Sequence, residues 1–107
     1  MTSMVGIPSL RGITLKEMVE DVKKRIECSD PVNVIKDAVD VLLLTDRKGE
    51  IHGFSLLLTY GGPNVTFNYI RGDAYIEARW GNEQERIDVD PKIAEKYIEA
   101  LEVFEPE

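Results

Sequence analysis

The sequence contains one histidine and one cysteine, so few side chains could perform acid-base, nucleophilic or metal chemistry. His52 could form a dyad only with a carboxylate, a serine or Cys28, and a multi-histidine metal site is excluded within one chain. Cys28 falls at the end of an expected helix, where carbonyl groups do not lower a thiol pKa, so we expect it to pack. We interpret His52 as a surface or strand-edge histidine. We predict no catalytic residue, no metal and no cofactor.

Carboxylates are abundant, with 20 acidic against 13 basic side chains. Three sets share an expected helix face: Glu17 with Asp21, Asp37 with Asp40, and Glu95 with Glu99 and Glu102. Such sets bind Mg²⁺ or Ca²⁺ only where fixed oxygens converge, and acids on a helix surface usually point into water. We therefore interpret them as solvated surfaces.

Two glycine-containing motifs are typical of turns. Gly61-Gly62-Pro63 is followed by an expected strand and lacks the Gly-Lys-Ser/Thr end of a phosphate loop. Arg71-Gly72-Asp73 spells an adhesion tripeptide, but it lies between two alternating segments that a tight turn would join. Both motifs predict hairpins.

The composition indicates one small globular domain. A chain of 107 residues, 43% hydrophobic and 31% charged, can bury one core and is too short for two, so 1–107 is expected as one domain with 1–13 as a loosely ordered tail. The net charge of -7 disfavours binding to nucleic acid. The longest apolar runs, 41–44 and 56–58, are too short for a membrane span, which takes ~20 residues.

The cysteine content and the N-terminus bear on the compartment. A single cysteine permits no disulfide within the chain, and the N-terminus has no basic, apolar leader pattern, so we expect a cytoplasmic protein. Few glutamines and many Glu, Ile and Val residues are typical of a heat-adapted source.

Three helices are expected. Thr14 and Glu17 form a capping box that begins an amphipathic helix ending near Cys28. Asp30-Pro31 begins a second helix, which we extend to about Thr45. The alternative takes residues 39–44 as a buried strand, because periodicity cannot classify a short apolar run.

Alternation and turn residues predict four strands, at 51–60, 65–70, 74–80 and 84–89. The third is the clearest, with Ala74, Ile76, Ala78 and Trp80 facing inward and Tyr75, Glu77 and Arg79 facing outward. Asp90-Pro91 then begins a last helix, whose inward stripe is Ile93, Ala94, Tyr97, Ile98, Leu101 and Phe104. The order α-α-β-β-β-β-α predicts a two-layer α+β fold, a four-stranded antiparallel meander with its helices on one face.

The outward face of this meander is the candidate binding site. It should carry Thr66, Asn68, Tyr75, Glu77, Arg79 and Arg86. Arginine and tyrosine on rigid strands are favoured at interfaces, whereas the competing interpretation is an ordinary solvated sheet with cross-strand pairs.

One stretch carries a resemblance. Thr59-Tyr60-Gly61-Gly62-Pro63-Asn64-Val65, followed by a hairpin that ends in Trp80-Gly81, resembles small uncharacterised prokaryotic proteins with a T-x-G-G-P turn and a W-G strand end. The resemblance implies the hairpin and assigns no activity.

Three functions are compatible with these features. The first is a non-catalytic protein-interaction or regulatory module, with a protein partner or a second copy of itself. The second is a small-ligand binder or enzyme that uses Glu77, Arg79, Arg86 and His52 at the sheet end. The third is an acidic mimic of DNA that inhibits a nucleic-acid-binding protein.

Overall fold

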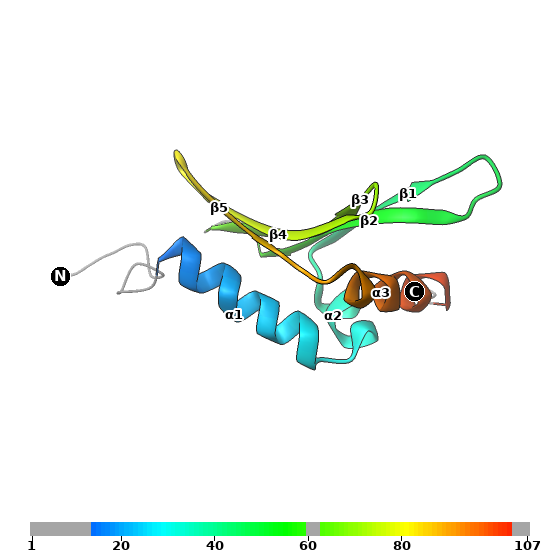
Figure 1. Cartoon of the computed structure of the whole chain (residues 1–107), viewed down its shortest axis with the longest axis horizontal. Coiled ribbons are helices and arrows are strands. Elements are labelled where there is room, and N and C mark those ends of the chain that lie inside the picture. Colours follow the sequence, from blue (N-terminus) through cyan, green and yellow to red (C-terminus); the bar gives the residue numbers. More distant parts are fainter. Residues whose placement is uncertain (1–13, 60–62, 104–107) are drawn as a thin grey trace.

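The computed structural model describes residues 14–59 and 63–103. In chain order the elements are α1 (Leu15–Cys28), α2 (Pro31–Asp37), β1 (Asp40–Thr45), β2 (Ile51–Thr59), β3 (Asn64–Ile70), β4 (Asp73–Trp80), β5 (Glu83–Asp88) and α3 (Pro91–Val103). The strands form one antiparallel sheet in the order β1-β2-β3-β4-β5, and the helices lie together on one side of it (Figure 1). The expected two-layer α+β fold is confirmed, with five strands instead of four.

Helix α1 begins where the capping box predicts. The Thr14 side chain accepts a hydrogen bond from the Glu17 amide at 3.1 Å, and the Glu17 carboxylate accepts one from the Thr14 amide at 3.0 Å. The buried face of the helix carries Leu15, Val19 and Ile26 and packs against β4 and β5. Cys28 is exposed, so the prediction that it packs is wrong. It lies two residues beyond Ile26, about 200° around the helix, and so points away from the core.

The second helix is much shorter than expected. Asp30 caps it by accepting from the Val32 amide at 3.0 Å, but the helix ends at Asp37 and the chain is extended from Ala38. The prediction of a helix to Thr45 is wrong. The alternative of a buried strand over residues 39–44 is right about the strand, observed at Asp40–Thr45, and wrong about its burial, because most of its residues are exposed. Pairing with β2, in the register Asp40 with Leu57, provides partners for the backbone groups on one side of this segment.

Among the described residues, the helix-facing side of the sheet supplies seven of the sixteen buried apolar residues of the core. Its buried positions are Phe54, Leu56, Val65, Phe67, Ala74, Ile76 and Ala78. Phe67 lies between Phe54 and Tyr97, with ring centroids 5.2 and 5.1 Å away in edge-to-face geometry. The inward and outward positions expected for β4 are confirmed by this burial.

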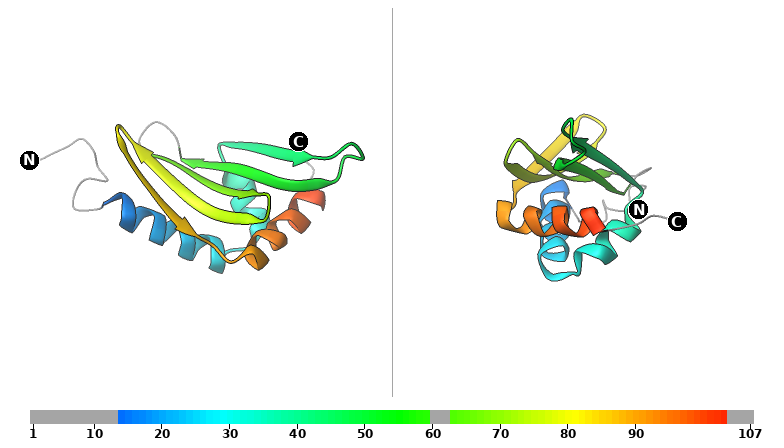
Figure 2. Two further views of the ribbon diagram at one scale, coloured as in Figure 1. Left: turned by 45° about the horizontal axis from the view of Figure 1, so that its top comes forward. Right: turned by 90° about the vertical axis from the view of Figure 1, so that its right-hand side faces the viewer.

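Helix α3 closes the core beneath β2 and β4 (Figure 2). Its buried residues are Ala94, Tyr97 and Leu101, as the stripe predicts, and Phe104 lies outside the described residues. The Tyr97 hydroxyl donates to the Ile26 carbonyl of α1 at 2.9 Å, and burial raises the pKa of Tyr97 to about 12. This bond ties the last helix to the first.

Two expected turns have different outcomes. Arg71 and Gly72 both have positive φ, 55° and 81°, as a tight hairpin turn requires, so that turn is confirmed. The turn at Gly61-Gly62 and the tail at 1–13 lie outside the described residues. Among the described helices, none is long and apolar enough to cross a membrane.

Candidate functional site

No described helix packs on the outward face of the sheet, and we call it the uncovered face. Figure 1 shows the two ends of the sheet rising away from the helix layer, so the uncovered face is concave. Strand register places the predicted side chains in adjacent rows: Asn68 opposite Tyr75, Thr66 opposite Glu77, and Glu77 opposite Arg86. All six predicted residues therefore share one surface.

Asn68 differs from the expectation, because its residue is only 6% exposed. Its carbonyl oxygen accepts from the Ser55 hydroxyl at 2.6 Å, and its amide donates to the Thr66 hydroxyl at 2.9 Å. The prediction of Asn68 as an exposed binding group is wrong. Ser55 on the adjacent strand β2 and Thr66 on the same strand β3 satisfy this side chain, so its role in the structure is to join β2 and β3.

Arg86 and Tyr75 form a second group on the same face. The Arg86 guanidinium lies 3.9 Å above the centre of the Tyr75 ring. It also donates to Asp73 at 2.7 Å and to Asp88 at 3.5 Å, and the bond to Asp73 is the main reason that the pKa of Arg86 is raised. Arg86 is thus held by β4 and β5 themselves.

Glu77 and Arg79 lie beside a shallow hollow of about 400 Å³ on the uncovered face. Its lining residues are Ser55, Leu57, Asn64, Thr66, Asn68, Glu77 and Arg79. Gln84 donates to Glu77, and the Arg79 side chain is 64% exposed with its Nε 4.0 Å from Glu77. The structure thus brings four of the six predicted residues to one hollow. Tyr75 and Arg86 do not line it.

The sequence interpretation missed a second feature, the β1 edge, which we define as residues Val39–Thr45. Its exposed apolar residues are Val39 at 60%, Leu42 at 63%, Leu43 at 40% and Leu44 at 39%. β1 is the first strand of the sheet and pairs with β2 on one side. Leu42 and Leu44 face the same way as Ser55 and Gly53, so the apolar surface continues onto the uncovered face. The run of leucines was the sequence signal, but a buried element was inferred from it.

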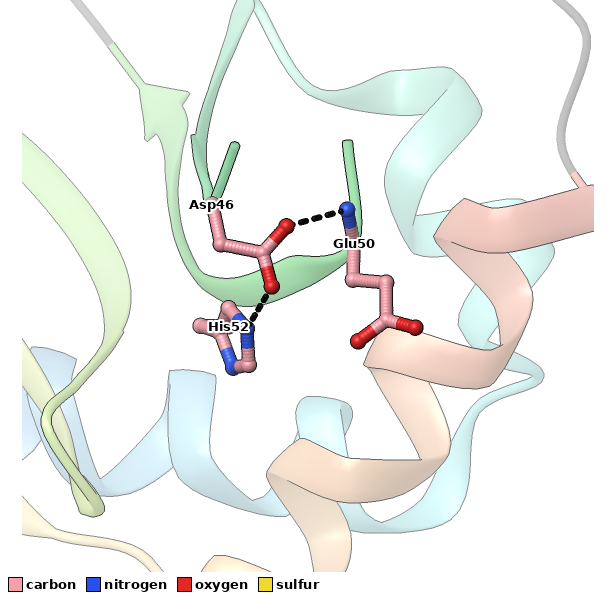
Figure 3. Close-up of side chains that lie close together, drawn as sticks. All are labelled: Asp46, Glu50 and His52. Carbon is pink, nitrogen blue, oxygen red and sulfur yellow. Dashed lines mark hydrogen bonds and ion pairs between the residues drawn. The ribbon is translucent and has the colours of Figure 1, made fainter. Parts of the chain in front are cut away.

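The β1–β2 hairpin also gathers Asp46, Glu50 and His52, whose candidate ligand atoms all lie within 4.8 Å of one another (Figure 3). One Asp46 oxygen accepts from the Lys48 and Glu50 amides at 2.8 and 3.0 Å, and the other lies 2.8 Å from His52 Nε2. The hydrogen bond lowers the pKa of Asp46 and raises that of His52. Both Asp46 oxygens already accept hydrogen bonds within the hairpin, so these contacts hold the loop in place. We call Asp46 and His52, with their hydrogen bond, the clamp.

His52 is a surface histidine as expected, with its side chain 62% exposed. It lines a second hollow, together with Glu95, Glu99 and Glu102 of α3. His52 lies at the hairpin and does not line the hollow that contains Glu77 and Arg79. The combination of His52 with those residues in one site is therefore wrong.

Comparisons of the chain with protein-family models, with curated proteins and with solved structures find no match. The resemblance drawn from residues 59–65 and 80–81 stays a prediction.

Proposed function

We propose that the protein is an interaction module that binds another protein chain through the β1 edge and the adjoining part of the uncovered face. The observation that carries the proposal is the exposure of three consecutive leucines, Leu42, Leu43 and Leu44, on a strand at the edge of the sheet. An unpaired strand edge presents N–H and C=O groups that another strand can bond.

The apolar content of this edge supports a binding role over simple solvation. Folded proteins usually protect an edge strand with charge, a proline or a bulge, because an exposed apolar edge promotes aggregation. β1 carries a single charged residue, Asp40, at its first position, has no proline, and has its one register irregularity at its end, between Leu44 and Thr45. An accessible apolar edge of this kind is an advantage to the protein only if a partner binds and covers the edge.

The groups on the rest of the uncovered face are suited to a supporting role. Arg79 is the more exposed cation there, with 64% of its side chain exposed against 45% for Arg86, and Arg86 is also bonded to Asp73. The hollow begins at Ser55 and Leu57 of β2, the strand next to β1, so a partner that extends from β1 across this face would meet Arg79.

Affinity isolation from the source cells tests the proposal, with Leu42→Lys as the variant and Gln84→Lys as the matched control. Both variants add one positive charge at an exposed position, one on each sheet edge. We expect the wild-type chain and Gln84→Lys to retain the same bound protein and Leu42→Lys to lose it. Equal capture by all three, with unchanged circular dichroism, would refute the proposal.

A second candidate function is the binding of a small polar ligand in the hollow beside Arg79. The observation in its favour is the combination of a hydroxyl, a carboxylate and an exposed guanidinium around one concavity. A ligand screen by thermal shift would test it. A hit that survives Arg79→Ala unchanged would exclude this hollow as its site.

A further inference from the structure

The β1 edge is self-complementary, and we propose that its occupant is a second copy of the same chain. Two β1 strands would pair antiparallel about a two-fold axis centred on Leu42 and join two five-stranded sheets into one of ten strands. This inference rests on the proposed function, because it requires the β1 edge to bind a protein chain.

The backbone of β1 has a donor available for this pairing. The Val41 amide donates to the carboxylate of its own neighbour, Asp40, at 2.9 Å, which indicates that this N–H points to the free side of the strand. Leu43 and Thr45 are in the same phase of the strand, so their backbone groups also point there. In the dimer a carbonyl of the second copy would replace the Asp40 side chain.

Charge favours a second copy over an unlike partner. From Val39 to Thr45 the edge carries one charged residue, Asp40, in a chain whose net charge is -7. The two copies would therefore meet through the less charged of the two edge strands, since β5 carries four charged residues. A strongly basic partner, which the overall charge would attract, finds only that one carboxylate on the edge.

The distribution of apolar residues also suits a second copy. Leu42 and Leu44 lie on the uncovered face, and Val41 and Leu43 lie on the helix side, opposite Leu56 and Phe54. Any strand that adds here meets apolar side chains on both faces. A second β1 presents apolar side chains on both faces in return.

The register follows from geometry and charge. Residues that face each other across an antiparallel pair lie on the same side of the sheet, so a symmetric pair must be centred on a residue. Centring on Leu43 would place Asp40 against Asp46 of the other copy, two like charges. Centring on Leu42 places Leu42 against itself, Val41 against Leu43, and Asp40 against Leu44.

The test combines molecular mass with a disulfide trap. The wild-type chain is measured by sedimentation velocity from low micromolar to near-millimolar concentration, and we expect a reversible shift from monomer to dimer. For the trap, Leu42→Cys and Leu43→Cys are each made in a Cys28→Ser background, because Cys28 is exposed. Leu42 and Leu43 are both exposed, so neither substitution opens a core cavity.

The trap distinguishes the register. Facing residues in an antiparallel pair lie ~4.5–5.5 Å apart at Cα, which a disulfide spans. Two Leu43 positions would be diagonal neighbours at ~7–8 Å, which is too far without backbone movement. We expect oxidation to give a covalent dimer of Leu42→Cys in high yield and little of Leu43→Cys. Equal yields, or a preference for Leu43→Cys, would overturn the proposed pairing.

Failure of this inference differs visibly from failure of the proposed function. A chain that stays monomeric at every concentration overturns the second copy as occupant, whether another protein or a segment of its own chain covers β1. The proposed function still stands if such a monomer captures a protein that Leu42→Lys loses. If the wild-type chain dimerises, and the wild-type and Leu42→Lys chains capture the same protein equally, the second copy stands as the occupant of β1. That result would refute the β1 edge as the binding site for other proteins.

Discussion

The two edges of the sheet are built from different chemistry. β5 reads Glu-Gln-Glu-Arg-Ile-Asp, and five of its six residues are exposed polar side chains. β1 reads Asp-Val-Leu-Leu-Leu-Thr and exposes its leucines. Within residues 14–59 and 63–103, each of these strands pairs with one neighbouring strand. Of the two, β5 has the charged composition that discourages further pairing.

The difference separates a charged edge whose side chains pair with one another from an apolar edge. At β5, Arg86 is fixed by Asp73 and by the ring of Tyr75, so the charged edge is also ordered. At β1, the charged residues stand at the ends, with Asp40 before the leucines and Asp46 after them. The apolar residues between Asp40 and Asp46 are enough for a short strand to pair with a partner strand.

The largest expected effect is on association and comes from Leu42→Lys. Burial of a leucine contributes ~1.5 kcal/mol or more, so loss from two copies should weaken the dimer by about 3 kcal/mol, roughly a hundredfold in Kd. Two lysines facing each other at the axis would weaken it further. Sedimentation velocity measures the change, and Gln84→Lys on β5 should leave the association constant within error. An unchanged association constant for Leu42→Lys would remove β1 from the interface.

The attachment of β1 and β2 to the sheet should depend on Gly53. A Cβ at this position would clash with the backbone carbonyl oxygen of Tyr69 on β3 and approach the side chain of Leu44. Gly53→Ala should therefore destabilise the fold by about 1–3 kcal/mol, as overpacking does, and displace the β1 edge. Urea denaturation measures the stability. Lys48→Ala is the comparison, because Lys48 is exposed on the same hairpin and only its backbone amide takes part in a hydrogen bond among the described residues.

The charged edge should respond differently. Arg86→Ala removes the contacts to Asp73, Asp88 and Tyr75, all on exposed parts of β4 and β5. We expect a lower melting temperature than wild type by less than Gly53→Ala produces, and no change in the association constant. If Arg86→Ala weakens self-association, β5 belongs to the interface. The proposed difference in role between β1 and β5 would then be wrong.

The smallest effect should come from the clamp beside the β1 edge. The pKa of His52 is raised by Asp46, so the stabilisation from protonated His52 is present below its unfolded pKa of ~6.5 and is lost as pH rises through the higher folded value. The pKa of Asp46 is lowered, so its contribution is lost only as pH falls through that low value. The carboxylates of Glu50, Glu95, Glu99 and Glu102 also face His52.

NMR titration of the His52 ring tests this assignment. Asp46→Asn should lower the pKa of His52 toward the ordinary value, whereas Glu99→Gln should lower it less. A pKa of His52 that is the same in Asp46→Asn and in wild type would contradict the clamp.

Local sequence chemistry predicted much of the fold. The capping box at Thr14, the proline at position 31 and the strict alternation of β4 each depend on neighbours in the sequence, and each is observed. Residues 39–44 were misassigned as helix because Asp40 keeps a helical spacing from Asp37 and because the apolar run 41–44 has no polar positions from which to measure a period. Only pairing with β2 decides that segment, and pairing is a property of the whole sheet.

The same limit explains the site. Asn68 is buried because Ser55 and Thr66 bond to it, and a single strand cannot reveal its neighbours across the sheet. The pairing of Asp46 with His52 follows only once β1 is known to be a strand, since a hairpin then brings them together. The β1 edge was missed for that reason as well.

Amide hydrogen exchange at low and high protein concentration tests the central claim most directly. The account predicts that the amides of Val41, Leu43 and Thr45 exchange more slowly as concentration rises, while those of β5 keep the same rate. Exchange at β1 that is independent of concentration would contradict the pairing of two copies through this edge.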